Sequence, residues 1–186
     1  PTAAAELRRD FGERLPGDPF MFPFANWRYY QCAGQREAVR AVMMAPAGST
    51  LVVNLPTGAG KSLCAYVPAL TDPAGLSVVV VPTTALAIDQ ERALAPYFSH
   101  ATAYYGGVGA LHEERNNGIR ARIRAGHQRI VFTSPESLVQ SLAGPLYNAA
   151  NHDSLRLLAI DEAHIVDQWG DDFRLDFQEL AGLRQD

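Results

Sequence analysis

The chain has 186 residues, the length of one domain with a single hydrophobic core. Its composition, 47% hydrophobic and 19% charged, excludes a disordered protein, and a net charge of −4 confines any nucleic-acid contact to local patches. No apolar run approaches the ~20 residues of a membrane span, so no membrane partner is expected. Cys32 and Cys64 stand apart without metal-ligand spacing, which favours a reducing cytoplasm.

The pattern of apolar residues predicts an α/β fold. A short helix is expected over residues 3–15, then a loop rich in proline and aromatic residues, so residues 1–24 precede a domain over residues 25–186. Apolar runs at 51–55, 77–81, 101–105, 130–133 and 155–160 predict strands. Helices are predicted at 34–44, 62–70, 84–95, 111–124 and 134–143. Short Val/Ile/Leu-rich strands that alternate with helices indicate a parallel sheet with helices on both faces.

A phosphate-binding loop is the first chemical signal. Pro56-Thr57-Gly58-Ala59-Gly60-Lys61-Ser62 lies between the first predicted strand and a predicted helix, and Lys61 is the only lysine of the chain. The glycines let backbone N–H groups surround phosphates, the Lys61 ammonium can reach the β- and γ-phosphates, and the Ser62 hydroxyl can hold Mg²⁺. A chance glycine turn is the alternative, but the order of strand, loop and helix favours the phosphate loop.

Two acids at a strand end are the second signal. The run at 155–160 leads into Asp161 and Glu162, and the carboxyl edge of a parallel sheet is where ligands bind in open α/β folds. Asp161 is placed to hold Mg²⁺ through water, and Glu162 to orient and deprotonate an attacking water. The pair could instead cap the next helix. Together with the phosphate loop, the catalytic interpretation is favoured.

Several motifs resemble those of one family. Asp161-Glu162-Ala163-His164 is similar to the DEAH box of superfamily 2 helicases, and the segment 168–174, Gln-Trp-Gly-Asp-Asp-Phe-Arg, resembles the aromatic-rich loop of RecQ DNA helicases. Gly34-Gln35-Arg36-Glu37 resembles the nucleotide-sensing motif of that family. The segments 80–90 and 132–138 resemble its DNA-contacting motifs. The order and spacing of these motifs cover about residues 25–184.

This resemblance implies the first RecA-like domain of an ATP-dependent DNA helicase, a P-loop NTPase that uses ATP and Mg²⁺. The catalytic residues implied are Lys61, Asp161, Glu162 and His164. ATP would be bound by Gln35, Thr57, Gly58, Ala59, Gly60, Lys61 and Ser62, and Mg²⁺ by Ser62 and Asp161. Single-stranded DNA would be contacted by Thr83, Thr84, Thr133, Ser134, Trp169, Phe173 and Arg174, through hydroxyl groups, aromatic stacking and a phosphate contact.

The sequence departs from the family pattern at two places. The family carries an aromatic residue and an arginine shortly before its nucleotide-sensing glutamine, where this chain has Gln31 and Cys32, so Trp27, Tyr29 or Tyr30 is expected to stack on adenine. Asp171 stands where the family often has histidine, and its charge would weaken attraction to DNA phosphates.

The densest basic stretch runs from Arg115 to Arg129 and includes His127. A patch that binds the nucleic-acid backbone is one interpretation. A solvated helix face, partly neutralised by Glu113 and Glu114, is the favoured one.

The resemblance also implies parts beyond this sequence. A second RecA-like domain would supply arginine fingers, movement on single-stranded DNA would run 3′ to 5′, and a coupling-motif strand would follow residue 186. Because that strand would lie between the strands at 51–55 and 155–160, these two are not expected to pair. The main prediction is a RecQ-type helicase. The alternative is a nucleic-acid-stimulated ATPase that translocates or remodels without unwinding, for example in a DNA-modification or defence system.

Overall fold

The computed structural model describes residues 13–24, 27–107 and 109–163. The chain divides into two compact parts, up to Val67 and from Pro68 onward, and each is described by itself. Within the described ranges, no helix combines the length and the apolar character needed to cross a membrane.

The first part is built around one amphipathic helix, α1 (Ala33–Met44). Before it, β1 (Leu15–Pro16) pairs antiparallel with β2 (Tyr29–Tyr30), and a short 3₁₀ helix, η1 (Pro19–Met21), lies between them. Asp18 fastens this loop to α1, because its carboxylate accepts hydrogen bonds from Tyr30 Oη at 2.7 Å and from Nε and Nη2 of Arg40 at 3.0 and 2.7 Å. The phosphate loop follows, and α2 (Leu63–Thr71) begins directly after it.

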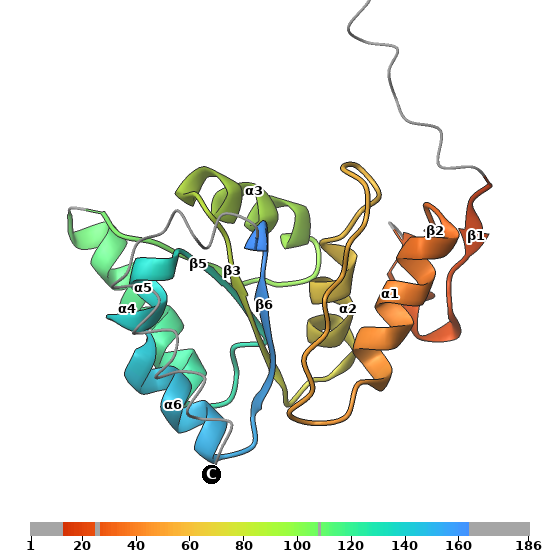
Figure 1. Cartoon of the computed structure of the whole chain (residues 1–186). Helices are drawn as coiled ribbons and strands as arrows, with labels where there is room; N and C mark the ends of the chain where they lie inside the picture. The colour runs from red at the N-terminus through yellow and green to blue at the C-terminus, as the bar shows by residue number, and fades with distance from the viewer. Residues whose placement is uncertain (1–12, 25–26, 108, 164–186) are drawn as a thin grey trace, which may run out of the picture. The chain divides into compact units, whose positions relative to one another are not determined.

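The second part contains a four-stranded parallel sheet (Figure 1). Its strands are β3 (Leu76–Val80), β4 (Ala103–Tyr104), β5 (Ile130–Thr133) and β6 (Leu155–Ile160), in the spatial order β4-β5-β3-β6. Central β3 is buried along its whole length and pairs with β5 on one side and β6 on the other. This confirms the prediction of a parallel sheet flanked by helices.

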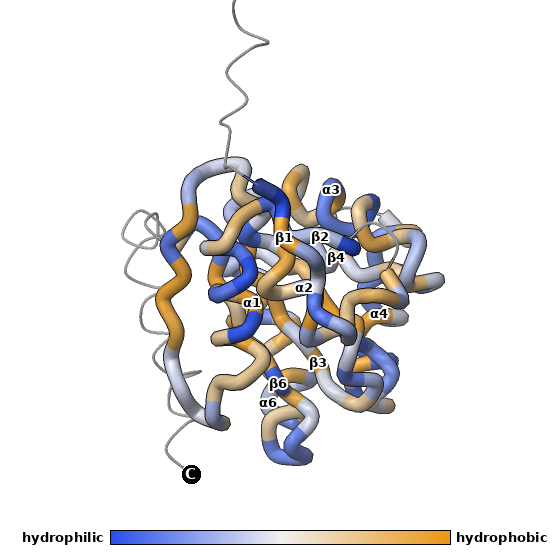
Figure 2. Tube along the Cα trace, turned by 90° about the vertical axis from the view of Figure 1, so that its right-hand side faces the viewer, coloured by the Kyte–Doolittle hydropathy of each residue, from blue (hydrophilic) through white to orange (hydrophobic). Residues whose placement is uncertain are grey.

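Helices cover both faces of this sheet. The helices α4 (Ala110–Arg124), α5 (Pro135–Val139) and α6 (Ala143–Asn151) group on one side (Figure 1). There Val78 and Val80 of β3 pack with Ile119, Leu138 and Leu146 in the main core. Helix α3 (Thr84–Leu94) contacts β4 and β5 and buries Ala87 and Leu94. Hydrophobic and hydrophilic stretches alternate along this part of the chain (Figure 2).

Two predicted elements differ from the structure. Residues 51–55 form no strand and join neither described sheet, and Leu51 and Val52 are 46% and 92% exposed. An apolar run becomes a strand only where another strand pairs with its backbone. The predicted helix over 134–143 is interrupted at Gln140, whose ψ is −79°, so that α5 and α6 form separately.

Candidate functional site

The phosphate loop contains two residues in the left-handed region of φ. The φ angle is 87° at Gly58 and 75° at Gly60, values that favour glycine. Between them Ala59 is fully buried, and its N–H donates to the oxygen of Pro56 at 3.1 Å. A compact turn of this kind directs successive N–H groups toward one side, the arrangement that binds phosphate oxygens. Its conformation therefore fits the predicted role.

Gln35 holds this loop from α1. Its side chain is only 3% exposed, its Nε2 donates to the backbone oxygen of Gly60 at 3.0 Å, and its Oε1 accepts from the N–H of Gln31 at 2.7 Å. A Cβ atom on residue 60 would overlap Gln35 Nε2, which adds a second reason for glycine there. The structure thus brings two predicted ATP-binding residues, Gln35 and Gly60, into direct contact.

The remaining loop residues lie before α2, with Lys61 and Ser62 closest to its start. Lys61 and Ser62 are half-buried and Thr57 is exposed. The Ser62 oxygen accepts hydrogen bonds from Ala65 N–H at 3.0 Å and Tyr66 N–H at 3.1 Å, which begins the helical hydrogen-bonding pattern. Lys61 therefore directly precedes a helix N-terminus, where the helix dipole favours bound anions.

The acids follow β6, as predicted. The Asp161 N–H donates to the oxygen of Val80 at 2.9 Å, which extends the pairing of β6 with β3 by one step. The Asp161 Oδ1 then accepts from the Glu162 N–H at 3.0 Å, and Glu162 has φ 53°. A non-glycine residue adopts this conformation at an energetic cost, a feature that clusters at functional sites. Both carboxylates are half-buried at the carboxyl edge of the sheet.

Four residues predicted to contact DNA lie at or just after the carboxyl ends of β3 and β5. Thr83 and Thr84 are exposed, and Thr83 caps α3 by accepting from Leu86 N–H at 3.2 Å. Ser134 caps α5, since its Oγ accepts from Ser137 N–H at 3.3 Å. Thr133 is fully buried, and its hydroxyl donates to the Ser134 oxygen at 3.3 Å. Its side chain therefore does not face solvent, unlike those of Thr83 and Thr84.

The three aromatic candidates for adenine stacking have different environments. Tyr30 is fully buried and bonded to Asp18, and burial raises the pKa of its hydroxyl. Trp27 is half-buried and packs against the Tyr66 ring, with centroids 5.6 Å apart. Tyr29 is 58% exposed. Of the three, Tyr29 is the most exposed.

The interpretation of the basic stretch as a solvated face is wrong for four of its arginines. Arg115 pairs with Glu91, Arg120 donates to Tyr104 Oη at 2.6 Å, and Arg122 donates to the Ala101 oxygen at 3.2 Å. Arg129 donates to the Leu70 oxygen at 2.7 Å. These contacts join residues far apart in the chain, beyond what a local sequence pattern reveals. Arg124 and His127 are exposed.

The other predicted site residues lie outside the described part of the chain. These residues are His164, Trp169, Phe173 and Arg174, together with Asp171.

Comparison with known proteins places the chain among helicases. The model of the family described as DEAD/DEAH box helicase matches residues 32–185. The RecQ-like DNA helicase blm-1 of Caenorhabditis elegans is 34% identical over 168 residues, which are 88% of this chain and 16% of that protein.

Two bacterial proteins described as ATP-dependent DNA helicase RecQ are similarly related. The Pasteurella multocida protein is 32% identical over 81% of this chain and 22% of its own length. The Haemophilus influenzae protein is 30% identical over 99% of this chain and 26% of its own length. The chain therefore spans about a sixth to a quarter of these relatives.

Proposed function

The chain belongs to the DEAD/DEAH box helicase family, and on this basis we propose that it is the first RecA-like domain of a RecQ-type, ATP-dependent DNA helicase. The observation that carries the proposal is the phosphate loop, in which Gly58 and Gly60 adopt left-handed conformations and Gln35 fixes the Gly60 carbonyl. The proposed domain covers residues 25–186, after an N-terminal segment over residues 1–24.

The phosphate loop is proposed to hold the triphosphate of ATP. Backbone N–H groups from Thr57 to Ser62 would surround the phosphate oxygens, and the Lys61 ammonium would reach the β- and γ-phosphates. The Ser62 hydroxyl and Asp161, the latter through water, are the proposed Mg²⁺ ligands. The bound Mg²⁺ neutralises charge on the phosphates. The loop conformation suits a bound triphosphate, and the side-chain oxygens of Ser62 and Asp161 suit Mg²⁺.

Glu162 is proposed as the general base. Its carboxylate would orient the attacking water and accept its proton, and its left-handed backbone supports a functional role. His164 completes the DEAH box and is proposed as a catalytic residue on the resemblance alone.

Adenine recognition is proposed for Tyr29 and Gln35. Tyr29 is exposed, whereas Tyr30 is buried and Trp27 packs on Tyr66. The Gln35 amide offers a donor and an acceptor that match the N6 and N7 edge of adenine. Within the protein, the Gln35 Nε2 already donates to the Gly60 oxygen and the Gln35 Oε1 already accepts from the Gln31 N–H. An adenine base would therefore compete with Gly60 and Gln31 for the Gln35 amide. Binding of adenine to Gln35 would thereby weaken the hydrogen bond from Gln35 to Gly60 and alter the support of the phosphate loop.

DNA binding is proposed at the carboxyl edge of the sheet. Thr83 and Thr84 are exposed there and can contact phosphates without reading sequence. Ser134 is half-buried, whereas Thr133 is buried and its oxygen accepts from the Val81 N–H, so a contact of Thr133 with DNA would require local opening of the strand end. Trp169, Phe173 and Arg174 are proposed to stack bases and bind phosphate, which would couple DNA to the nucleotide site.

The remaining proposals concern the whole protein. A second RecA-like domain would supply arginine fingers, and closure of the two domains on ATP would drive 3′-to-5′ movement on single-stranded DNA. Three relatives are described as DNA helicases, which supports DNA as the partner. A cytoplasmic location is also proposed, since Cys32 and Cys64 are both free thiols.

A nucleic-acid-stimulated ATPase that does not unwind is the second candidate. Asp171, where the family often has histidine, favours it, because a carboxylate weakens attraction to DNA phosphates. A strand-separation assay on the full-length protein distinguishes the two functions. We expect ATP-dependent release of one strand from a duplex with a 3′ single-stranded tail. ATP hydrolysis stimulated by single-stranded DNA without strand release would instead support the second candidate.

A further inference from the structure

One outer strand of the sheet has a free edge. β4 pairs with β5 on one side, and among the described strands none pairs with its other side. In a parallel ladder, alternate residues direct their N–H and C=O groups to opposite sides. Since the Thr102 oxygen accepts from Phe132 of β5, the backbone groups of Ala101, Ala103 and Tyr105 face outward, and the N–H of Thr102, which precedes β4, also bonds on the outer side. Outward backbone groups that no side chain bonds are a template for pairing with another strand.

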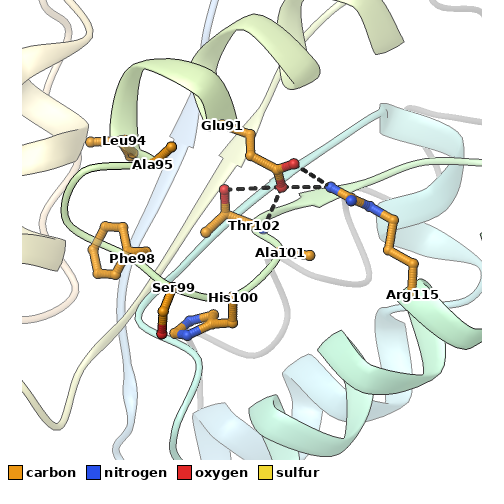
Figure 3. A pocket seen from close by; sticks show the side chains of 9 residues that line it. All are labelled: Glu91, Leu94, Ala95, Phe98, Ser99, His100, Ala101, Thr102 and Arg115. Carbon is orange, nitrogen blue, oxygen red and sulfur yellow. Dashed lines mark hydrogen bonds and ion pairs between the residues drawn. The ribbon is translucent and has the colours of Figure 1, made fainter.

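Side chains from α3 and α4 occupy this edge. Glu91 Oε2 accepts hydrogen bonds from the N–H groups of Thr102 and Ala103 at 2.6 and 2.7 Å, and Arg115 Nε donates to the Ala103 oxygen at 3.0 Å. Figure 3 shows the Glu91 carboxylate between Thr102 and Arg115. Two more outward carbonyls are also satisfied. Arg122 Nη2 donates to the Ala101 oxygen at 3.2 Å, and Asn116 Nδ2 donates to the Tyr105 oxygen at 2.9 Å.

An ion pair links the two central side chains. Arg115 Nη2 donates to Oε1 and Oε2 of Glu91 at 2.6 and 2.5 Å, and each side chain is 24% exposed. Burial alone would raise the pKa of Glu91. The Arg115 guanidinium and the N–H groups of Ala103 and Thr102 outweigh it, so this pKa is lowered and the carboxylate stays charged at neutral pH. By contrast, Asp89 and Arg92 on the same helix form an ion pair that is 66% and 75% exposed.

We propose that the Glu91–Arg115 pair guards this sheet edge and keeps β4 from pairing with a strand of a second copy of this chain. A strand that approached β4 would have to displace Glu91 and Arg115 from the backbone groups of Thr102 and Ala103, and these two largely buried charges would lose those hydrogen bonds, which is costly. The β4 side chains would not prevent pairing by themselves, because Ala103 and Tyr104 are buried and leave the edge to the backbone.

The test compares Glu91→Ala with wild type in the full-length protein, with Asp89→Ala as the matched control from the same helix. Sedimentation velocity over a concentration series should show a larger mean mass for Glu91→Ala at high concentration, and no change for Asp89→Ala. At low concentration, the amide hydrogens of Thr102 and Ala103 should exchange about tenfold faster than in wild type, as expected for a lost hydrogen bond worth ~1.4 kcal/mol. They should slow again as the protein associates.

A second substitution shows whether association uses this edge. Ala103→Pro removes the outward N–H while the β5 ladder continues through Thr102, so the double variant Glu91→Ala/Ala103→Pro should return to the wild-type mass. Circular dichroism of Ala103→Pro alone checks its fold. If Glu91→Ala unfolds, Arg115→Met takes its place. This substitution frees only the Ala103 carbonyl, and it should likewise increase the mean mass at high concentration. The proposal is overturned if the mean mass of both Glu91→Ala and Arg115→Met equals that of wild type, or if the double variant still associates.

Discussion

Gln35 Nε2 donates a hydrogen bond to the Gly60 carbonyl at 3.0 Å, and this contact joins α1 to the phosphate loop. The same side chain accepts from the Gln31 N–H at 2.7 Å, so both ends of the buried amide are used inside the protein. A residue expected to sense the base is thus also a support of the loop that is proposed to hold the phosphates.

The first prediction tests this support. Gln35→Glu replaces the donor facing Gly60 with an acceptor, and a lost hydrogen bond is worth ~1.4 kcal/mol, or about tenfold in affinity. We expect the Kd for ATP to rise by about this factor, and the Kd for GTP to rise as well, because the loop loses its support with either base. Calorimetric titration measures both. Glu37→Gln, at an exposed neighbour, should leave both values unchanged, and unaltered GTP binding in Gln35→Glu would contradict the loop role.

Glu162→Gln should separate binding from hydrolysis. The substitution keeps size and hydrogen bonding but removes the base, so ATP–Mg²⁺ should still bind while turnover falls by about 10²–10⁴. Nucleotide binding and steady-state hydrolysis, measured on the full-length protein, report the two effects. Loss of binding with no specific loss of turnover would show that Glu162 has a structural role.

Residues 1–186 alone should hydrolyse ATP slowly. The proposed arginine fingers come from a second RecA-like domain, and such groups contribute about 10³–10⁵ in rate. Comparison of turnover between this chain and the full-length protein at saturating ATP measures the difference. Robust hydrolysis by the chain itself would point to a self-contained ATPase.

The hydrogen bonds of the Asp18 carboxylate with Tyr30 and Arg40 should make the stability of the fold depend on pH. Hydrogen bonding to Arg40 lowers the pKa of Asp18, although burial opposes the shift. A carboxyl group with a lowered folded-state pKa stabilises the fold above its unfolded value of ~3.9 and loses this effect as pH falls through the folded value. Asp18→Asn should therefore reduce the free energy of unfolding at pH 7, and the difference from wild type should shrink below about pH 4. Urea unfolding at pH 7 and below about pH 4 measures the difference in the free energy of unfolding between Asp18→Asn and wild type.

Asp89→Asn is the control for that experiment. Its partner Arg92 is 75% exposed, and exposed ion pairs contribute little to stability. An equal loss at pH 7 in both variants would contradict a special role for Asp18.

Local sequence signals predicted much of this fold correctly. Apolar runs located β3, β5 and β6, because buried parallel strands are continuous in hydrophobicity. The phosphate loop and the Asp161–Glu162 pair were predicted because their chemistry requires particular residues in consecutive positions.

Features that depend on distant partners were not predictable. The run at 51–55 has strand composition but joins no described sheet, since pairing depends on a neighbouring strand. The arginines of α4 looked like a solvated face, yet Arg115 pairs with Glu91, which is 24 positions away. The predicted helix over 3–15 lies largely outside the described residues, and the aromatic-rich loop at 168–174 lies wholly outside them. Both stay predictions.

In the proposed DNA-coupled ATPase, Lys61 of the phosphate loop is the residue on which hydrolysis depends. The most direct measurement is the rate of ATP hydrolysis by the full-length protein, with and without single-stranded DNA, for wild type and Lys61→Ala. We predict hydrolysis that DNA stimulates in wild type and that is abolished in Lys61→Ala while the circular dichroism spectrum is unchanged. Near wild-type turnover in Lys61→Ala would contradict the claim, as would wild-type hydrolysis that does not respond to DNA.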